Sequence, residues 1–362
     1  MTTYLLAGGG TAGHVNPLLA VADRLRSRDA GAEIIVLGTA EGLESRLVPA
    51  RGFELVTIPR TPMPRRPNAD ALRFPARWRA AVATVERLLV ERHVDVVFGV
   101  GGYASAPAYV AAHRGRVPIA IHEANARPGW ANRLGARYSR HVGVAFADTQ
   151  IRGGVFVGQP LRPEIERLAD PIVRAAARAE GAEAFGLDPG RPTLLVTGGS
   201  SGALRINETI TASVPDILAT GWQILHASGE FREEIALDVP GYRPVRYLDR
   251  MDLALAVADL SLGRSGTGTV AETAALGIPA VFIPYTGSNG EQRLNAAGAV
   301  AAGGAVLVED AQFTPAWVRG ELVPLLLDQA RLGAMGERIA TVGAIDGTDR
   351  TVALIDGAVS SR

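Results

Sequence analysis

The chain has 362 residues, 47% of them hydrophobic and 20% charged, and it contains no cysteine. Its 37 basic residues are all arginine, and they balance 37 acidic residues. These values exclude disulfides, thiolate metal sites, cysteine nucleophiles and lysine-dependent chemistry, and the length accommodates two domains with sizeable cores.

The charge is divided unevenly along the chain. Residues 1–162 carry 21 arginines and 12 carboxylates, a net charge of +9, whereas residues 163–362 carry 16 and 25, a net charge of −9. A basic half followed by an acidic half indicates two domains with different partners. No apolar run reaches the ~18 residues of a membrane span, and the first residues lack a basic leader, so we expect neither a span nor a signal peptide.

Short aliphatic runs alternate with helical stretches, which predicts parallel sheets built from strand–helix units. In the first half we expect strands at 4–7, 33–37, 53–58, 94–100 and 118–122, and helices at 17–28, 43–51, 80–93, 104–113 and 130–138. In the second half we expect strands at 193–197, 222–226, 260–262 and 280–284, and helices at 203–218, 270–276 and 292–302.

The two halves open alike, because residues 5–14 align without gaps on residues 194–203. Each segment reads as a strand, a loop of glycines and hydroxyl residues, and a helix. We therefore predict an α/β fold in which two Rossmann-like, doubly wound domains face one another across a cleft. The expected domains are 1–162 and 163–340, with a helical segment at 341–362 that packs back on the first domain.

Three glycine loops follow expected strands, at residues 8–13, 99–102 and 198–202. Backbone N–H groups beside a positive helix end bind anions, so the loops predict a ligand with phosphate groups, the alternative being tight-turn packing. The first loop also fits Gly-x-Gly-x-x-Gly. However, the second strand ends at residues 37–39 without the acid that a NAD site requires, which argues against a dehydrogenase.

His14 distinguishes the two halves, because its counterpart in the second loop is Ala203. A histidine at the start of a helix has a lowered pKa and stays neutral, as a general base must. The alternative is a helix-terminal histidine bonded to solvent or backbone. His122 and Glu123, beside Asn125, have two interpretations, as site residues or as polar capping at a strand end.

The acidic half holds a second candidate site at residues 264–272, where a small-residue loop opens a helix. Its N–H groups and hydroxyls suit a diphosphate, and Glu272 suits a ribose, although an acid is favoured in the first turns of any helix. Gln292 and Asn295, three residues apart, present amides on one helix face for sugar hydroxyls; helix capping is the alternative.

Residues 60–79 form a basic segment with six arginines and one acid, together with Leu72, Phe74 and Trp78. Arginine near an anionic leaflet contributes about 1 kcal/mol, and apolar side chains enter the interface. The segment therefore predicts a membrane-facing surface, the alternative being a loop whose aromatic side chains pack inward.

Six motifs occur in order, at residues 9–17, 101–105, 122–125, 198–203, 264–272 and 292–296. Together they resemble the MurG family, GT-B glycosyltransferases that add GlcNAc from UDP-GlcNAc to lipid-linked MurNAc-pentapeptide. The resemblance implies an inverting transfer to the 4-hydroxyl of MurNAc, giving lipid II and UDP in peptidoglycan biosynthesis. It further implies a peripheral protein on the cytoplasmic face of the cell membrane, with no nucleic-acid partner. No Asp-x-Asp metal clamp is present, so we expect neither a metal nor another cofactor.

The same resemblance assigns roles to individual residues. The favoured base is His14, and Leu248 matches the position whose backbone reads uracil, with Tyr247 covering the nucleotide. The remaining expected substrate contacts are Thr11, Ala12, Gly13, Tyr103, Asn125, Arg162, Ser200, Thr267, Gly268, Thr269, Val270, Ala271, Glu272, Gln292 and Asn295. Three positions depart from the usual pattern, namely Ala12, Ser201 and Glu291, where Gly, Gln and His are common.

Other functions stay open at this point. A UDP-GlcNAc 2-epimerase on the same fold would need carboxylates around the sugar ring, of which the first half supplies mainly Glu123. A non-catalytic nucleotide-sugar binding module would bind the donor without transferring its sugar. Incubation with UDP-GlcNAc alone separates an epimerase from a transferase, since a transferase does almost nothing without an acceptor.

Overall fold

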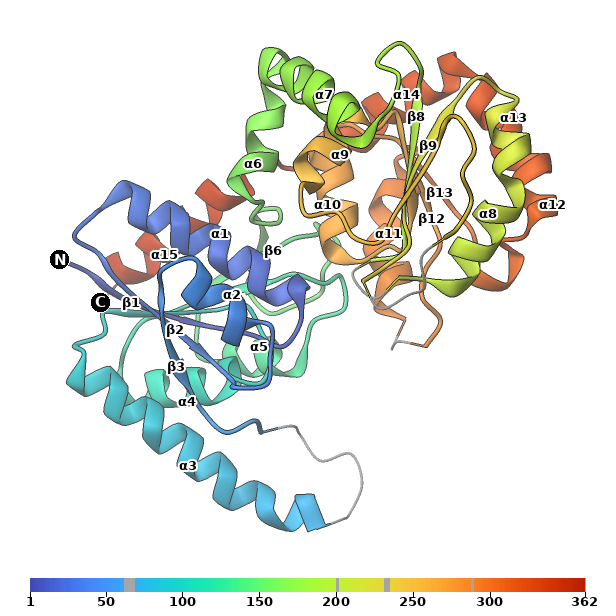
Figure 1. Ribbon diagram of the computed structural model, residues 1–362. Helices are drawn as coiled ribbons and strands as arrows, with labels where there is room; N and C mark the ends of the chain where they lie inside the picture. The colour runs from blue at the N-terminus through green and yellow to red at the C-terminus, as the bar shows by residue number, and fades with distance from the viewer. Residues whose placement is uncertain (62–68, 200–201, 231–234, 288–289, 362) are drawn as a thin grey trace. The chain divides into compact units, whose positions relative to one another are not determined.

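The computed structural model describes residues 1–61, 69–199, 202–230, 235–287 and 290–361, and the chain divides into two compact units. Unit 1 comprises Met1–Arg162 and Asp346–Arg362, and unit 2 comprises Pro163–Ile345 (Figure 1). Unit 2 thus extends beyond the expected boundary at 340, because the turn after its last helix packs on that unit: a Cβ at Gly343 would collide with the backbone of Ala274.

Unit 1 is built on a parallel sheet with the strand order β3-β2-β1-β4-β5-β6-β7 among the described residues. Strand β1 lies inside the sheet and pairs with β2 on one side and with β4 on the other. The strands are β1 (Thr3–Ala7), β2 (Glu33–Gly38), β3 (Glu54–Thr57), β4 (Val96–Gly99), β5 (Ile119–Glu123), β6 (His141–Val144) and β7 (Gly154–Phe156).

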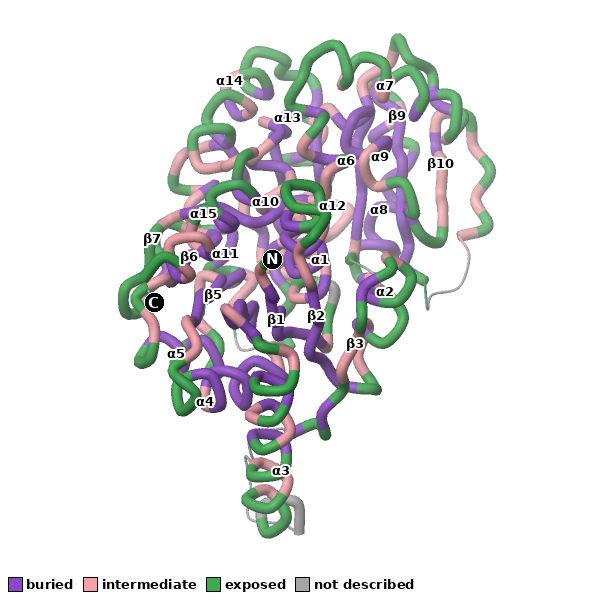
Figure 2. Tube along the Cα trace, turned by 90° about the vertical axis from the view of Figure 1, so that its left-hand side faces the viewer, coloured by how far each residue is buried: buried purple, intermediate pink, exposed green. Residues whose placement is uncertain are grey.

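Both faces of this sheet are buried, because alternate residues of β1 enter two separate cores. Leu5 and Ala7 pack under α3 (Ala69–Glu91) and α4 (Ser105–Gly115), whereas Tyr4 and Leu6 pack under α1 (Ala12–Arg28) and α15 (Gly347–Ser360). Figure 2 shows the central strands buried between these helices. The shorter helices α2 (Glu44–Ala50) and α5 (Trp130–Gly135) follow β2 and β5.

The C-terminal helix α15 belongs to unit 1 although it is last in the sequence. Its Asp349 and Asp356 pair with arginines of α1, Asp356 with Arg28 at 2.9 Å and Asp349 with Arg24. At its start, Thr348 Oγ1 accepts the Leu161 N–H at 3.1 Å. The helix therefore covers the sheet of unit 1 and also holds the segment near Arg162, where the first of the two chain segments of unit 1 ends.

Unit 2 repeats the architecture with the parallel strand order β10-β9-β8-β11-β12-β13 among the described residues. Its strands are β8 (Thr193–Thr197), β9 (Gln223–Ala227), β10 (Tyr242–Val245), β11 (Leu260–Gly263), β12 (Ala280–Phe282) and β13 (Ala305–Leu307). Its α-helices are α6 (Pro163–Glu166), α7 (Pro171–Phe185), α8 (Leu204–Leu218), α9 (Met251–Val257), α10 (Thr267–Ala275), α11 (Glu291–Ala301), α12 (Pro315–Trp317), α13 (Val323–Leu327) and α14 (Gln329–Ala340). Short 3₁₀ turns at Arg167–Ala169 and Asp310–Gln312 and a π-turn at Val318–Leu322 complete it.

The predicted pair of doubly wound, parallel-sheet domains is confirmed, but several element bounds were wrong. Helix α1 begins at Ala12 rather than at 17, and α3 begins at Ala69 rather than at 80. Pro17, the sixth residue of α1, hid the true start of that helix, and Pro75 hid that of α3. Strands β6, β7, β10 and β13, three or four residues each, were not predicted. No helix in the described ranges is long and apolar enough to cross a membrane.

Candidate functional site

The glycine loop after β1 is built around the carboxylate of Glu44. This side chain is buried at the start of α2 and accepts hydrogen bonds from Gly10 N (2.7 Å), Thr39 N (2.9 Å) and Thr39 Oγ1 (2.8 Å). A Cβ at Gly9 or Gly42 would collide with the carboxylate, so a side chain at either position would displace Glu44. Burial raises the pKa of Glu44, but the hydrogen bonds outweigh it and hold the pKa below its ordinary value. An anion therefore lies beneath this loop.

His14 lies in the first turn of α1, directly after the loop, and is half-buried. Its Nδ1 is 3.3 Å from Thr11 Oγ1, and its Nε2 edge faces Gly101, where an added Cβ would lie 3.3 Å from Nε2. Burial lowers the pKa of His14, and the negative charge of Glu44 opposes this only in part. The imidazole is therefore neutral at neutral pH and able to take up a proton.

The second glycine loop, after β4, packs against the first. Gly101 and Gly102 have φ values of +94° and +83°, and a Cβ at Gly102 would collide with Gly9 O. Ser105 Oγ accepts the Gly101 N–H at 3.1 Å and lies 2.8 Å from Ala7 O, which ties the loop to the end of β1. Because β1 and β4 are neighbours, the two loops form one surface at the carboxyl edge of the sheet.

Tyr103 and Arg60 lie at the border of this surface. The Arg60 guanidinium sits 4.4 Å from the centre of the Tyr103 ring and donates to its hydroxyl at 3.0 Å. The stacking places a positive charge beside the glycine loops, where an anionic substrate group would meet it.

Glu123 is buried and its carboxylate is occupied by the chain itself. It accepts hydrogen bonds from Asn125 N, Gly129 N and Asn132 Nδ2, each at 2.9 Å. Burial raises its pKa, and these hydrogen bonds oppose the rise. The same Asn132 amide donates to His122 O at 3.0 Å. Glu123 therefore shapes the loop after β5, and Asn125 stands half-buried on that loop.

His122 is also buried, one residue before Glu123. Its Nε2 donates to Gly158 O at 2.8 Å, and its Nδ1 has no hydrogen-bond partner among the described residues. Burial, with His14 nearby, lowers the pKa of His122 to about 4 against the opposing hydrogen bond. The bond holds the segment that ends the first run of unit 1 at the half-buried Arg162.

In unit 2, the loop between β11 and α10 leaves open space above the helix start. Val270 N bonds Gly266 O at 3.1 Å, so the N–H groups before Val270 precede the helical hydrogen-bond ladder. A Cβ at Gly266 or Gly268 would meet nothing within 4 Å. Ser265 Oγ is buried without a partner among the described residues. A positive helix end with room above it is suited to an anion.

The side chains around this loop fix its shape. Asn295 of α11 is buried, with Nδ2 3.4 Å from Ser265 O and 3.5 Å from Thr267 Oγ1. Its amide therefore lies within reach of the loop that opens α10. Gln292 is half-buried and accepts the Tyr285 N–H at 2.9 Å through Oε1.

The other expected contacts lie as follows. Leu248 is buried in the loop after β10, and the neighbouring Tyr247 is 49% exposed. Thr11 and Gly13 are exposed, and Ala12 lies in the first turn of α1. Ser200 and the side chain of Ala12 lie outside what the structure describes. The expected contacts on α10 include the buried Thr267 and Val270. The other four are half-buried, namely Gly268, Thr269, Ala271 and Glu272.

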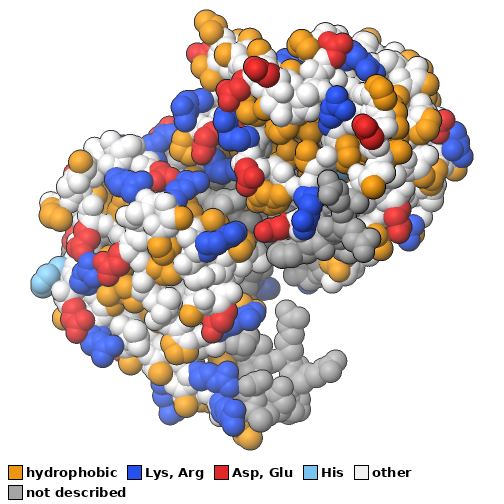
Figure 3. Space-filling view, viewed as in Figure 1, with side chains coloured by type: hydrophobic (Ala, Val, Ile, Leu, Met, Phe, Trp, Pro, Cys, Tyr) orange, Lys and Arg blue, Asp and Glu red, His pale blue; other side chains and the backbone are white. Residues whose placement is uncertain are grey.

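An aromatic cluster lies near the start of α3. Phe74 and Trp78 stack with ring centres 5.8 Å apart, and Trp130 meets Trp78 edge-on at 6.0 Å. Trp78 also packs on the core of unit 1, whereas Leu72 is 85% exposed. Figure 3 shows basic and hydrophobic side chains together where α3 begins. Trp130 was not among the residues expected on this surface.

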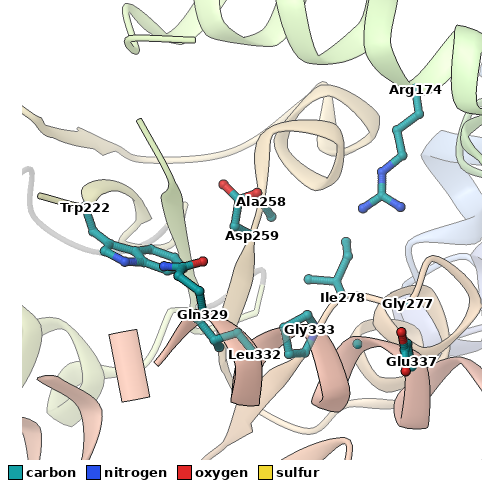
Figure 4. A pocket seen from close by; sticks show the side chains of 12 residues that line it. Arg174, Trp222, Ala258, Asp259, Gly277, Ile278, Gln329, Leu332, Gly333 and Glu337 are labelled. Atoms are coloured by element: carbon teal, nitrogen blue, oxygen red, sulfur yellow. The ribbon is translucent and has the colours of Figure 1, made fainter. Parts of the chain in front are cut away.

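A cavity of about 350 Å³ lies at the other edge of the unit 2 sheet, where β11 and β12 begin (Figure 4). Two of its polar groups are bonded within the chain: Arg174 donates to Leu276 O at 2.8 Å, and Asp259 accepts from Arg178 at 2.9 Å. Because the cavity lies where the strands begin, it is separate from the loops at their carboxyl ends. No group of three or more metal-ligating side chains was found among the described residues.

The chain matches two family models, the glycosyltransferase family 28 N-terminal domain over residues 4–144 and the C-terminal domain over residues 193–350. A protein of Leifsonia xyli subsp. xyli named UDP-N-acetylglucosamine--N-acetylmuramyl-(pentapeptide) pyrophosphoryl-undecaprenol N-acetylglucosamine transferase is 60% identical over 361 residues, which cover 100% of both chains.

Solved structures agree with this relationship. The crystal structure of Acinetobacter baumannii MurG is 26% identical, with a TM-score of 0.80 over 99% of this chain and 100% of that chain. A UDP-GlcNAc 2-epimerase from Neisseria meningitidis, at 14% identity and a TM-score of 0.68 over 99% of this chain and 100% of that one, shares the fold alone. With both domain models matched and 60% identity along its whole length, the chain belongs to the MurG family of glycosyltransferases.

Proposed function

We propose that this chain transfers N-acetylglucosamine from UDP-GlcNAc to the 4-hydroxyl of MurNAc in undecaprenyl-diphospho-MurNAc-pentapeptide, giving lipid II and UDP in peptidoglycan biosynthesis. The observation that carries the proposal is the 60% identity, over the whole of both chains, to a protein named for this transfer. The open helix start at residues 266–268 supports it, because a diphosphate leaving group needs such a site.

In the proposed reaction, the MurNAc 4-oxygen attacks the anomeric carbon of GlcNAc from the side opposite the diphosphate. The bond from that carbon to the diphosphate oxygen breaks, and UDP leaves with the electron pair, so the configuration inverts to a β-1,4 linkage. The hydroxyl proton passes to His14, which is neutral because burial lowers its pKa. A positioned base of this kind contributes about a hundred- to ten-thousand-fold in rate.

The donor is assigned to the strand-end loops by the resemblance to the family. The start of α10, from Thr267 to Ala271, would bind the diphosphate, and Glu272 the ribose hydroxyls. Leu248 would read uracil through its backbone, and Gln292 and Asn295 would bind the GlcNAc hydroxyls. Further proposed substrate contacts are Thr11, Ala12, Gly13, Tyr103, Asn125, Arg162 and Ser200.

The reaction is proposed to need no bound cation, since the sequence contains no Asp-x-Asp clamp. Turnover should persist in chelator with metal-free substrates, and a loss of activity that magnesium restores would disprove this. The protein is further proposed to act as a peripheral protein on the cytoplasmic face of the cell membrane, where its lipid-linked acceptor lies. The exposed Leu72 and the aromatic cluster beside arginines support this position.

The epimerase alternative has less support. The carboxylate it would need, that of Glu123, is buried and bonded to Asn125 N, Gly129 N and Asn132. Incubation with UDP-GlcNAc alone decides the question, because an epimerase would form UDP-ManNAc and a transferase would leave the sugar unchanged.

The proposed base is tested by transfer of labelled GlcNAc from UDP-GlcNAc to a lipid I analogue. We expect His14→Ala to lower kcat/KM about a hundred- to ten-thousand-fold. His113→Ala, which removes an exposed histidine of α4, is the matched control and should leave turnover unchanged. Near-parental turnover of His14→Ala would exclude this base and leave the transferase assignment intact, whereas donor binding without transfer by the parent would indicate a binding module.

A further inference from the structure

We propose that Glu44 is a positioning residue for the transfer reaction, in which its buried carboxylate fixes the glycine loop that places His14. The inference rests on the proposed role of His14 as the base. Glu44 does not face an open surface: it is 1% exposed and both carboxylate oxygens are engaged by groups of its own unit.

The glycine loop after β1 is shaped around the Glu44 carboxylate. Backbone N–H groups in a glycine loop commonly point at a ligand anion, but Gly10 N donates to Glu44 at 2.7 Å. The anion position at this N–H is therefore occupied by the chain itself. Gly9, Gly38 and Gly42 surround the Glu44 side chain closely: a Cβ at Gly9 or Gly42 would collide with its carboxylate, and a Cβ at Gly38 would collide with its Cγ. The loop is thus shaped around Glu44 before any substrate arrives.

The position of this loop also determines the position of His14. Gly9 O packs on Gly102, where a Cβ would collide with it, so a shift of the first loop would also move the second. His14 follows the first loop and has its Nε2 beside Gly101 of the second. A displaced carboxylate would therefore change the position of the imidazole relative to both loops.

Glu44 also acts on His14 through its charge. Among the described residues, the titratable groups that interact with His14 are Glu44 from α2 and His122 from β5. His122 is neutral at neutral pH because its pKa is about 4. Glu44 thus supplies the nearby negative charge, which raises the pKa of His14 against the lowering effect of burial. It also stabilises the imidazolium that forms as the proton is transferred.

The test is Glu44→Gln, which keeps the shape of the side chain and removes its charge. We expect kcat to fall about ten- to a hundredfold, as for a small displacement of a catalytic group, with KM for UDP-GlcNAc unchanged. Because the anion that raises the pKa of His14 is gone, the acid limb of the kcat/KM profile should move to lower pH. Glu54→Gln is the matched control. Glu54 lies on β3, pairs with Arg92 and is far more exposed than Glu44, so the variant should keep the parental rate and pH profile.

A double-mutant cycle separates this inference from the proposed base. If Glu44 acts through His14, then Glu44→Gln in a His14→Ala background should cause little further loss. If the losses from Glu44→Gln and His14→Ala were fully additive, the inference would be overturned. A parental kcat in Glu44→Gln would overturn it too, as would a fall in kcat that follows a lowered Tm while the pH profile stays parental. A parental rate for His14→Ala alone would instead overturn the base assignment.

A second variant keeps the inference testable if Glu44→Gln does not fold. Thr39→Val removes the hydroxyl that donates to Glu44 at 2.8 Å and keeps the backbone N–H and the charge. We expect a severalfold lower kcat, an unchanged donor KM and an unshifted acid limb. A parental kcat in this variant would overturn the inference.

Discussion

The guanidinium of Arg264 lies 2.5 Å from Asp310 Oδ1 and also donates to Ile283 O at 3.0 Å and Pro284 O at 3.2 Å. Both side chains of the pair are mostly buried, so the arginine braces the loop before α10 and its charge is neutralised within unit 2. We therefore propose that the half of the chain with a net charge of −9 holds its anionic donor through backbone N–H groups and the positive N-terminal end of α10.

The first prediction concerns this pair. Asp310→Asn should leave a largely buried guanidinium without its counter-charge, and the free energy of unfolding should fall by about 3 kcal/mol. Because the loop loosens, KM for UDP-GlcNAc should rise as well. Urea unfolding followed by tryptophan fluorescence measures the stability. Asp216→Asn, which breaks the exposed 3.5 Å pair with Arg319, is the control and should change stability by less than about 1 kcal/mol. Equal losses in the two variants would contradict the bracing role.

A second prediction uses the open space above α10. Gly266 has φ −64°, which alanine adopts without strain, and its Cβ would meet nothing within 4 Å. Gly266→Ala should therefore fold with parental or slightly higher stability while its methyl group obstructs the diphosphate. We expect KM for UDP-GlcNAc to rise about tenfold or more, the equivalent of about 1.4 kcal/mol. Gly333→Ala, on α14 beside the cavity at the opposite sheet edge, should leave KM unchanged. An unchanged KM in Gly266→Ala would place the diphosphate elsewhere.

A third prediction is the response of stability to acid. His226 is buried between Tyr242 OH (2.9 Å from Nδ1) and Asn207 Oδ1 (3.1 Å from Nε2), and burial lowers its pKa to about 4. The unfolded chain takes up this proton near pH 6.5 and the folded chain only near pH 4, so unfolding becomes easier as pH falls between these values.

Between pH 6.5 and pH 5, His226 should lower the free energy of unfolding by about 2 kcal/mol. His226→Gln should be less stable at pH 7, because the imidazole packs between two partners, yet lose less stability on acidification than the parent. Urea midpoints measured from pH 7 to pH 5 in both proteins give the difference in slope. Parallel curves would show that His226 does not titrate in this way.

Much of the fold follows from local pattern, and the misses have identifiable causes. Strand β8 was predicted at its observed bounds because five consecutive buried residues lie between clear turn signals. Helix α7 was missed although its signals are present: Asp170 caps Ile172 N at 2.8 Å, proline follows, and Gly186 ends it with φ +64°. Its residues are largely exposed, so the apolar periodicity used to find helices is weak there.

The site was predicted less completely than the fold. His14 and the glycine loops are adjacent in sequence, so their pattern was visible. Glu44 follows β2 but acts on the loop after β1, and only the parallel pairing of these two strands brings them together. Asn132 bonds His122 and Glu123 from α5, which no sequence pattern indicated. The sequence nonetheless offered a way to find Glu44. A NAD site requires an acid at the end of the second strand, and Glu44 lies only a few residues beyond that position.

The last prediction concerns the aromatic cluster. The three residues expected on the membrane-facing surface differ in exposure. Trp78 packs on the core, Phe74 is half-buried, and Leu72 is 85% exposed. Replacing Trp78 would therefore disturb unit 1 itself. Leu72→Ser with Phe74→Ser is the better test, and it should weaken binding to anionic vesicles about ten- to a hundredfold, since burying such a side chain contributes roughly 1.5–3 kcal/mol.

Vesicle sedimentation at two salt concentrations measures both parts of this surface. Binding of the parent should fall with salt, because the arginines near the start of α3 attract anionic lipid through screened charges. Val90→Ser provides a control at the other end of the same helix, where Val90 is 74% exposed, and it should bind vesicles as the parent does. UDP-GlcNAc binding should be equal in all three proteins. If the double variant binds vesicles like the parent, or if Val90→Ser weakens binding as much, the start of α3 is not the membrane-facing surface.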